Sequence, residues 1–467
     1  MIKQYYYIQC VFIIILSFFL AVFFNKTCPA ASASKDFNIV LITIDTLRAD
    51  HLSCYGYHRK TSPNIDKIAK KGIVFKNAIA PSSWTVPSMV SLFTSVYPIN
   101  HGVVHGFFEN KKISNQELFS DELTTLTETL KTHGYTTFGV ASNLHLDGRL
   151  GFARGFDYFK CLPFLSAPHV NKIIYSWKDN IKNSDKFFIW AHYVDPHHPY
   201  YPKAPWIEQY ISKTSTQKLI LSKKRRYELL QLIPMLKKDP QSLAYLIALY
   251  DSEINFVDSY IGKLIQKFEL DKNTLIIITS DHGEEFLEHD QLDHGNNLHQ
   301  ETIHIPLIIK LPYSTKKEMA EKHVTLLDIM PSILHILDIN PPEQTIGKSF
   351  WEMEGIISWL KQISQRKGAP NYTFSELDRN NNISKTIMTQ KWKYIFNYKN
   401  KTEHLFNLKS DPLEKNDLAD KNIKQRNKLR EQFINWVSHS RKYPTKKKTI
   451  QILPQEKEKL KALGYIN

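Results

Sequence analysis

The sequence predicts an α/β fold, with a large, mostly parallel sheet sandwiched by helices and a small C-terminal α+β subdomain. Apolar, β-rich runs occur at residues 38–44, 187–194, 275–279 and 305–311. Strands that are buried on both faces have this composition. Helix-like stretches lie between the runs, for example residues 64–71 before Gly72 and residues 123–132 before Gly134. Strands that alternate with helices in this way form a mostly parallel sheet.

The N-terminus differs from the rest of the chain. Lys3 precedes an apolar run over residues 11–24, and the small-residue sequence Ala31-Ser32-Ala33 follows. The run is shorter than the roughly 20 residues of a membrane span, and the whole pattern is typical of a secretory signal. Residues 1–33 are therefore predicted to be a signal peptide, with an uncleaved N-terminal anchor as the alternative. Either reading predicts export, to the periplasm or outside the cell.

The remaining length suits one catalytic domain and a smaller second unit. The chain has 467 residues, of which 42% are hydrophobic and 23% are charged, and this is ordinary for a globular protein. We predict a catalytic domain over residues 37–365 and a C-terminal subdomain over residues 366–467. Within the subdomain we expect a polar linker at 366–379, a small antiparallel hairpin at 386–398 and a helix at 422–440.

The net charge of +15 indicates what the chain could bind. It favours an anionic substrate or contact with an anionic membrane surface, although lysines spread over a solvated surface would give the same total. No zinc finger or aromatic-plus-basic module indicates nucleic acid. The four cysteines form neither a disulfide scaffold nor a zinc cluster, and a disulfide between Cys54 and Cys161 stays open.

Acids and histidines follow three of the apolar runs. Asp45 comes directly after residues 38–44, and Asp281 and His282 come directly after residues 275–280. His192, Asp195 and His197 close the run that starts at residue 187. In open parallel sheets, ligands bind at the carboxyl ends of the strands. Carboxylates and imidazoles that converge there make a divalent metal site a reasonable prediction.

Short motifs in a fixed order add a family resemblance. They are Asp45-Thr46-Leu47-Arg48-Ala49-Asp50, Ser62-Pro63-Asn64, Thr85-Val86-Pro87-Ser88-Met89, Pro196-His197-His198-Pro199, Ser280-Asp281-His282-Gly283-Glu284, His294-Gly295, Leu405-Phe406-Asn407-Leu408 and Leu463-Gly464-Tyr465. In this order they resemble the sulfatase family of the alkaline phosphatase superfamily. The resemblance covers nearly everything after residue 37, and it implies the alkaline-phosphatase-like form of the predicted fold.

The departures from the family pattern concern the reactive residues. Thr85 stands where sulfatases carry the Cys or Ser that is oxidised to formylglycine, and threonine cannot give that aldehyde because its Cβ carries a methyl group. Met89 stands in place of the arginine that supports formylglycine. Thr46 replaces a second metal-binding Asp, and His282 replaces an Asn. The family lysine after the Gly-Tyr segment is missing, and Ser142-Asn143 follows instead.

This altered set resembles another branch, the phosphoethanolamine and phosphoglycerol transferases and the phosphatases, in which a threonine oxygen binds the metal and attacks phosphorus. The resemblance implies one divalent metal with four ligands: Asp45, Thr85, Asp281 and His282. His197 and His294 would hold the oxygens of the transferred group, or a second metal. Mixed Asp/Thr/His ligation favours Zn²⁺ or Mn²⁺, whereas Ca²⁺, which prefers an all-oxygen site, stays an alternative.

Each assignment has a structural alternative. Asp45 and Thr85 could simply cap helices. Three further histidines compete with His197 and His294: His192, His198 and His299. We expect a structural role for His101, and we expect Glu284 and Glu285 in the first turn of a helix.

Three functions are consistent with these residues. The first is hydrolysis or transfer of a phosphoester through a metal-activated Thr85, with a small anionic ester, a glycan or a lipid head group as substrate. The second is hydrolysis of a sulfuric ester, as in arylsulfatases, without formylglycine. The third is a catalytically inactive protein of the cell envelope that binds glycans or lipids. The basic stretch 203–239 could form a lid, a membrane-facing edge or a surface insertion.

Overall fold

The structure is a computed structural model that describes residues 37–106, 116–201, 203–211, 226–351, 372–379, 381–450 and 453–462. The predicted signal or anchor at 1–33, the predicted boundary at 365/366 and the closing motif at 463–465 lie outside these residues. The signal and the domain boundary therefore stay predictions. Within the described ranges, no helix has both the length and the apolar character needed to cross a membrane.

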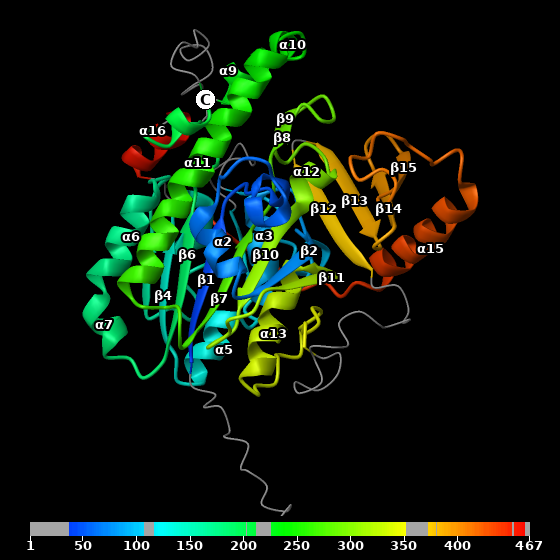
Figure 1. Cartoon of the computed structure of the whole chain (residues 1–467). Helices are drawn as coiled ribbons and strands as arrows, with labels where there is room; N and C mark the ends of the chain where they lie inside the picture. The colour runs from blue at the N-terminus through cyan, green and yellow to red at the C-terminus, as the bar shows by residue number, and fades with distance from the viewer. Residues whose placement is uncertain are drawn as a thin grey trace, which may run out of the picture. The chain divides into compact units, whose positions relative to one another are not determined.

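An eight-stranded sheet forms the centre of the fold (Figure 1). Its strands, in spatial order, are β11 (Glu318–Thr325), β2 (Ile73–Ile79), β10 (His304–Lys310), β7 (Thr274–Ser280), β1 (Asn38–Ile44), β6 (Phe187–Tyr193), β4 (Thr136–Ala141) and β5 (Tyr158–Cys161). β10 runs antiparallel to β2 and β7, and the other neighbouring strands are parallel. The predicted mostly parallel sheet is confirmed, and the four predicted runs are β1, β6, β7 and β10.

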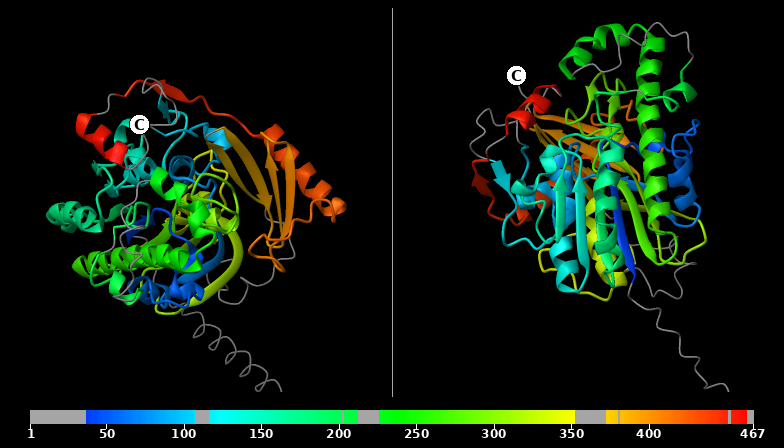
Figure 2. Two further views of the ribbon diagram at one scale, coloured as in Figure 1. Left: turned by 90° about the horizontal axis from the view of Figure 1, so that it is seen from above. Right: turned by 90° about the vertical axis from the view of Figure 1, so that its left-hand side faces the viewer.

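Helices cover both faces of this sheet (Figure 2). On one face α2 (Pro63–Ala69), α6 (Ala167–Ser176) and α11 (Pro240–Lys267) share a core with alternate residues of β1, such as Val40 and Ile42. On the other face Phe93 of α3 (Thr85–Thr94) packs edge-on against Trp190 of β6, with ring centroids 4.8 Å apart. Because side chains alternate along a strand, each strand contributes to both cores.

The remaining α-helices of the described residues are short except for α15 (Ile423–His439). They are α4 (Pro98–His101), α5 (Leu126–Thr132), α7 (Lys178–Lys182), α9 (Arg226–Gln231), α10 (Ile233–Leu236), α12 (Gln300–Ile303), α13 (Ile329–Ile336), α15 (Ile423–His439) and α16 (Pro454–Ala462). The predicted helix at 123–132 is α5, and it starts later than predicted because Thr125 and Glu128 form a capping box there. The predicted helix at 422–440 is α15, which Asn422 caps by accepting from the Gln425 N–H.

The C-terminal part forms a four-stranded antiparallel sheet of β12 (Thr373–Arg379), β13 (Asn382–Met388), β14 (Trp392–Asn397) and β15 (Thr402–Asn407). α15 packs on this sheet through Leu429 and Phe433 (Figure 1). The predicted hairpin at 386–398 is half of it. The predicted linker at 366–379 is wrong for residues 373–379, which are β12. This strand is polar because its inward side chains form hydrogen bonds with a distant segment of the same chain. Ser375 Oγ, for example, donates to the Ala80 carbonyl at 2.6 Å.

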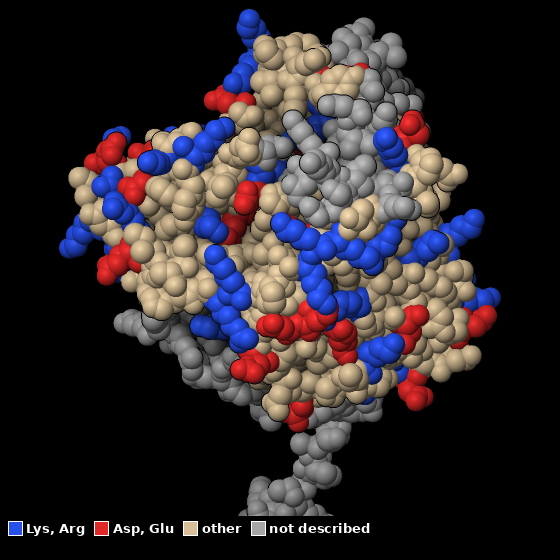
Figure 3. Space-filling model, turned by 180° about the vertical axis from the view of Figure 1, so that it is seen from behind, with Lys and Arg blue, Asp and Glu red and all other residues tan. Residues whose placement is uncertain are grey.

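The described strands also form two small two-stranded ladders: β3 (Gln116–Leu118) with β16 (Lys446–Lys448), and β8 (Glu285–Phe286) with β9 (Leu292–Asp293). On the face shown in Figure 3, lysines and arginines lie among acidic residues. Cys54 and Cys161 are both free thiols.

Candidate active site

The strand register brings the predicted ligands together. Ile44 of β1 pairs with Ser280 of β7, so the residues that follow them, Asp45 and Asp281, leave the same edge of the sheet as neighbours. This is the carboxyl edge of two adjacent parallel strands, where ligands of α/β proteins bind. Both carboxylates are fully buried. The sequence prediction that these two acids converge is therefore matched by the geometry.

The Nε2 atom of His282 lies at the centre of the predicted ligand set. It is 3.3 Å from Thr85 Oγ1, 3.4 Å from Asp281 Oδ2 and 3.6 Å from Asp45 Oδ1. The other ring nitrogen, Nδ1, lies 2.9 Å from the Gly283 carbonyl oxygen, to which it donates. This hydrogen bond places the lone pair on Nε2, facing the three oxygens.

These spacings fit a divalent cation. Ligands about 2.0–2.1 Å from a tetrahedral ion are about 3.3–3.4 Å apart, and ligands about 2.4 Å from a six-coordinate ion have similar spacing. The distances therefore suit Zn²⁺ and Ca²⁺ alike. The imidazole of His282 favours Zn²⁺ or Mn²⁺ over Ca²⁺.

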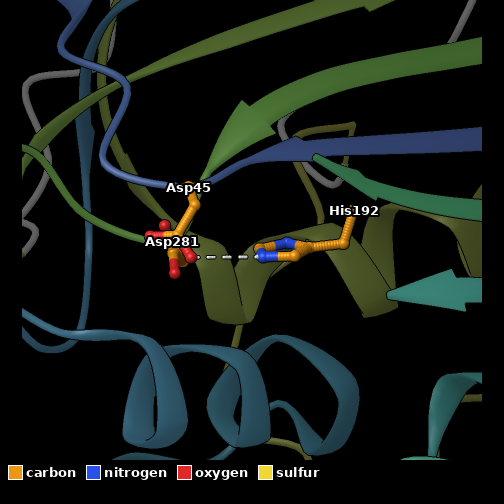
Figure 4. A group of neighbouring side chains, drawn as sticks. All are labelled: Asp45, His192 and Asp281. Carbon is orange, nitrogen blue, oxygen red and sulfur yellow. Dashed lines mark ion pairs between the residues drawn. The ribbon is translucent and has the colours of Figure 1, made fainter. Parts of the chain in front are cut away.

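Unsatisfied buried atoms provide an independent test of this fit. Within the described residues, Asp45 Oδ1, Asp281 Oδ2 and His192 Nε2 are buried without a hydrogen-bond partner. Figure 4 shows the two carboxylates side by side and the His192 ring directed at them. Buried carboxylates are costly unless they are paired or bind a metal. The donor set thus suits the divalent ion that the sequence predicts.

His192 and Asn143 contact Asp45, although neither belongs to the predicted ligand set. His192 Nε2 lies 3.4 Å from Asp45 Oδ2, and the Asn143 amide donates to the same oxygen at 2.8 Å. His192 is positioned by its register with Thr43, whose hydroxyl lies 2.8 Å from His192 Nδ1. The sequence marks Asn143 only because Ser142-Asn143 follows the Gly-Tyr segment where the family has a lysine.

Burial and mutual repulsion set the charges of the two acids. Burial, together with the charge of Asp45, raises the pKa of Asp281 to about 8. Burial also disfavours the charged form of Asp45, but His192, His197 and His282 outweigh it and hold the pKa of Asp45 below its usual range. Burial lowers the pKa of His282, so its imidazole is neutral, as a metal ligand must be.

Thr85 is the first residue of the buried helix α3, and Trp84 is the N-cap. The Thr85 hydroxyl points to His282 and does not cap the helix, so the simple capping role considered for Thr85 is wrong. The first amides of a helix have no partner within the helix, and the Trp84 side chain has no oxygen to offer them. The helix therefore presents N–H groups and a positive dipole end next to Thr85.

Thr46 links the two acids through its backbone. Its N–H donates to Asp281 Oδ1 at 3.3 Å, and its hydroxyl donates to the Asp45 carbonyl at 2.7 Å. Its φ is 58°, which is unusual for a β-branched residue. Strained backbone of this kind is concentrated at functional sites.

His197 and His294 continue a row of imidazoles that starts at His282. The ring centroids of His282 and His294 are 4.4 Å apart, and those of His294 and His197 are 5.0 Å apart. His294 Nδ1 lies 2.8 Å from Asp293 Oδ1 and 3.2 Å from Glu284 Oε1, while His197 Nδ1 faces the His198 carbonyl. Each ring is thus oriented through Nδ1.

Several other candidates have structural roles. Asp195 accepts from the Ala167 N–H at the start of α6, and His299 Nδ1 lies 3.1 Å from Glu414. His101 bonds Ser91 and the Val103 N–H, as a structural residue would. The predicted helix turn at Glu284 and Glu285 is wrong, because this segment enters the β8–β9 hairpin. In this hairpin Glu285 pairs with Asp293, and Glu284 Oε1 lies 3.2 Å from His294 Nδ1.

Two further groups have the composition of a metal site. In the first, Glu284, Asp293 and His294 lie together, and Arg226 also pairs with Asp293. The second consists of Glu285, His289 and Glu301. In it His289 Nδ1 lies 2.6 Å from Glu301, and Glu285 accepts from the His289 and Gln291 amides. Hydrogen bonds and ion pairs already hold both groups together.

Two more residues near the site were missed from the sequence. Arg379, at the end of β12, is 6% exposed and stacks over Trp84, with Cζ 4.9 Å from the ring centroid. His145 lies edge-on to the same ring at 6.0 Å. No local pattern marks either residue, because both reach the site through long-range packing.

Known proteins resemble this chain in sequence and in fold. Relatives include the uncharacterised sulfatase YidJ of Escherichia coli (25% identical, covering 67% of this chain and 70% of the relative) and an ulvan-active sulfatase of Formosa agariphila (26% identical, covering 68% and 64%). Similar solved structures include a phosphonate monoester hydrolase of Agrobacterium radiobacter (TM-score 0.65, 18% identical, covering 88% and 96%). Another is a protein in complex with its substrate D-glucosamine-2-N,6-O-disulfate (TM-score 0.67, 19% identical, covering 86% and 97%). At these identities the structures show a shared fold.

Family models give the clearest result. The model described as Sulfatase matches residues 37–339, and the model described as N-sulphoglucosamine sulphohydrolase, C-terminal, matches residues 288–441. Members of the family are ester hydrolases and typically bind a divalent metal. Since the first match spans more than half of the sequence, the chain belongs to the sulfatase family.

Proposed function

We propose that this protein cleaves or transfers a phosphoester, with Thr85 as the nucleophile and Asp45, Asp281, His282 and Thr85 as the ligands of one divalent metal. The observation that carries the proposal is the Thr85 hydroxyl at 3.3 Å from His282 Nε2, within the buried ligand group. A divalent ion held there would lower the pKa of the Thr85 hydroxyl and neutralise charge on the ester. Zn²⁺ and Mn²⁺ are the ions we favour.

The proposed reaction has two balanced steps. In the first, Thr85 Oγ1 loses its proton to solvent and forms a bond to phosphorus, while the bond from phosphorus to the alcohol oxygen breaks. The electron pair leaves with that oxygen, which takes a proton from solvent, while the His197 and His294 rings donate hydrogen bonds to the phosphoryl oxygens. In the second step, water or an acceptor alcohol gives its proton to solvent and attacks phosphorus. The bond from phosphorus to Thr85 Oγ1 breaks, and this oxygen takes a proton from solvent.

The surroundings of Thr85 suit this chemistry. Phosphoryl transfer depends mainly on positioning and on neutralising negative charge. The N-terminus of α3 offers N–H groups to a non-bridging oxygen, and the oriented rings of His197 and His294 can donate to others. His192 and Asn143 orient Asp45 without taking part in bond breaking.

Hydrolysis of a sulfate ester is the second candidate, and the names of the relatives favour it. Formylglycine sulfatases work through a geminal diol, which can expel sulfate by restoring the aldehyde. A sulfated threonine has no second hydroxyl on Cβ, so it would have to be hydrolysed at sulfur. A phosphorylated threonine can instead be attacked at phosphorus. For this reason we place the phosphoester first.

The nucleophile can be identified directly. Metal-loaded protein is exposed briefly to an aryl phosphate or, separately, to the matched aryl sulfate, and the peptide that carries Thr85 is analysed by mass spectrometry. We expect an adduct from the phosphate on Thr85, none in Thr85→Ala, and partial activity in Thr85→Ser. Full activity in Thr85→Ala would refute the proposal. Sulfate release without a phosphate adduct would favour the second candidate, and binding without any turnover would favour an inactive envelope protein.

The substrate is proposed at the level of its class. An anionic ester of a glycan or of a lipid head group fits the family and the basic net charge. We also propose that the protein acts outside the cytoplasm, either in the periplasm or beyond it, because its N-terminal segment resembles a secretory signal.

A further inference from the structure

The first strand of the C-terminal sheet is bonded to the segment that leads to Thr85. The Glu376 N–H donates to the Pro81 carbonyl at 2.9 Å, and Ser82 and Glu376 form a parallel bridge. Glu376 Oε1 also accepts from the Ile99 N–H at 2.8 Å, beyond the end of α3. β12 is therefore held in register with the chain on both sides of α3.

The end of β12 is fixed on its other side by the loop that carries His294. The Asn382 amide donates to the Asn296 carbonyl at 2.5 Å. Arg379 packs so closely on Gly295 that a Cβ there would lie 2.4 Å from Nη1. Arg379 is thus held between Trp84, which precedes Thr85, and Gly295, which follows His294.

The charge of Arg379 acts on the site. Burial lowers the pKa of His145 to about 3, and the charge of Arg379 is a further cause.

Most of the Arg379 side chain is buried, but the residue borders a cavity. Arg379 lines an open cavity of about 430 Å³ together with polar residues of the His294 loop, among them Gln291, Asn296 and Asn297. One side of the arginine therefore faces solvent-accessible space, and the other side faces the residues next to Thr85. An arginine fork in such a place is suited to the oxygens of a tetrahedral anion.

We propose that Arg379 binds a non-bridging oxygen of the anionic ester, so that the C-terminal sheet supplies part of the substrate site. The inference rests on the proposed function only for the place of the ester beside Thr85. It makes Arg379 a substrate-binding residue, and it assigns the ordered docking of β12 a role in positioning that residue.

Anion binding without turnover tests this role. Inorganic phosphate and sulfate are titrated calorimetrically into the metal-loaded, full-length Thr85→Ala protein, alone and combined with Arg379→Gln, Arg379→Lys or Arg430→Ala. Loss of one charge-assisted hydrogen bond predicts affinity about 10- to 150-fold weaker in Arg379→Gln, with Arg379→Lys in between. Arg430, half-exposed on α15 at 3.4 Å from Glu403, is the matched control and should leave affinity unchanged.

The outcomes separate this inference from the proposed function. The role of Arg379 is overturned if both Arg379 variants bind phosphate and sulfate within twofold of the parent affinity and unfold at the parent temperature. This holds even if Thr85 is the nucleophile. Weakened binding of either anion supports it even if Thr85 forms no adduct. In the Thr85-containing protein, we expect the Arg379→Gln substitution to lower kcat/KM by a similar factor. If Arg379→Gln unfolds, the Arg379→Lys comparison decides: affinity equal to the parent overturns the role of the arginine fork.

Discussion

Glu414 pairs with Lys393 inside the C-terminal part and also contacts His299 and Gln300 at the start of α12, and replacing Glu414 with Gln should expose the contribution of the ion pair. Lys393 Nζ lies 2.8 Å from Glu414 Oε1, and both side chains are fully buried. The second carboxylate oxygen accepts from the Gln300 N–H at 2.8 Å and lies 3.1 Å from His299 Nδ1. Glu414→Gln keeps the shape and leaves Lys393 as a buried charge without its counter-ion.

The magnitude follows from two routes. Removing one partner of a buried pair costs about 3–5 kcal/mol. Independently, burial disfavours ionised Glu414, but Lys393 and His299 outweigh it and lower its pKa from 4.5 to about 2. That shift corresponds to about 3 kcal/mol of stability at neutral pH. Because the pKa is lower in the folded state, this stability is complete above about pH 4.5 and is lost as the pH falls towards 2.

Urea unfolding, followed by tryptophan fluorescence, measures this difference. We expect the free energy of unfolding of Glu414→Gln to be about 3 kcal/mol below wild type at pH 7, and the gap to shrink to less than half at pH 3. The double variant Lys393→Met/Glu414→Leu should recover part of the loss, since it removes both charges. A gap under about 0.5 kcal/mol at pH 7, or one of equal size at pH 7 and pH 3, would refute the reasoning.

Two further predictions concern the ligand group. Zn²⁺ or Mn²⁺ at about one hundred times its Kd should raise the free energy of unfolding of the chelator-treated protein by about 2.7 kcal/mol, measured by thermal unfolding. If the metal stabilises Asp45→Asn equally, the assigned ligands are wrong. Gly283→Ala should lower the free energy of unfolding by about 1–3 kcal/mol and weaken metal binding, because the new Cβ would lie 2.1 Å from the Glu301 carbonyl oxygen. Unchanged metal affinity, measured by calorimetry, would contradict this prediction and show that the His282 backbone tolerates the shift.

The parts of the site that could be predicted from the sequence are those fixed by neighbouring strands. Asp45 and Asp281 each follow an apolar run, and parallel pairing of adjacent strands brings such residues together. The motif order then placed Thr85 and His282 beside them, and the structure brings all four within hydrogen-bonding or ion-pair distance. The α/β class follows from the same apolar runs.

The parts that could not be predicted depend on packing between distant segments. β12 looked like a linker because its inward residues are polar, and their partners, such as the Ala80 carbonyl, lie almost 300 residues earlier in the chain. Arg379 was missed with it. Glu284 and Glu285 have the composition of a helix start, but contacts with His294 and Asn297 hold them in a hairpin. Tertiary contacts override such local preferences.

The charges of the site connect the choice of nucleophile with the role proposed for Arg379. Two buried carboxylates and one divalent ion sum to zero, so the ligand group alone offers no net positive charge to a substrate. A phosphate monoester dianion carries one more negative charge than a sulfate ester. The N-terminus of α3 supplies on the order of half a positive charge, and Arg379 supplies a whole one. Met89 and Asn143 are neutral where the family resemblance implies cations. In the proposed role, Arg379 would compensate for them, and a dianionic phosphoester would need this charge more than a sulfate ester would.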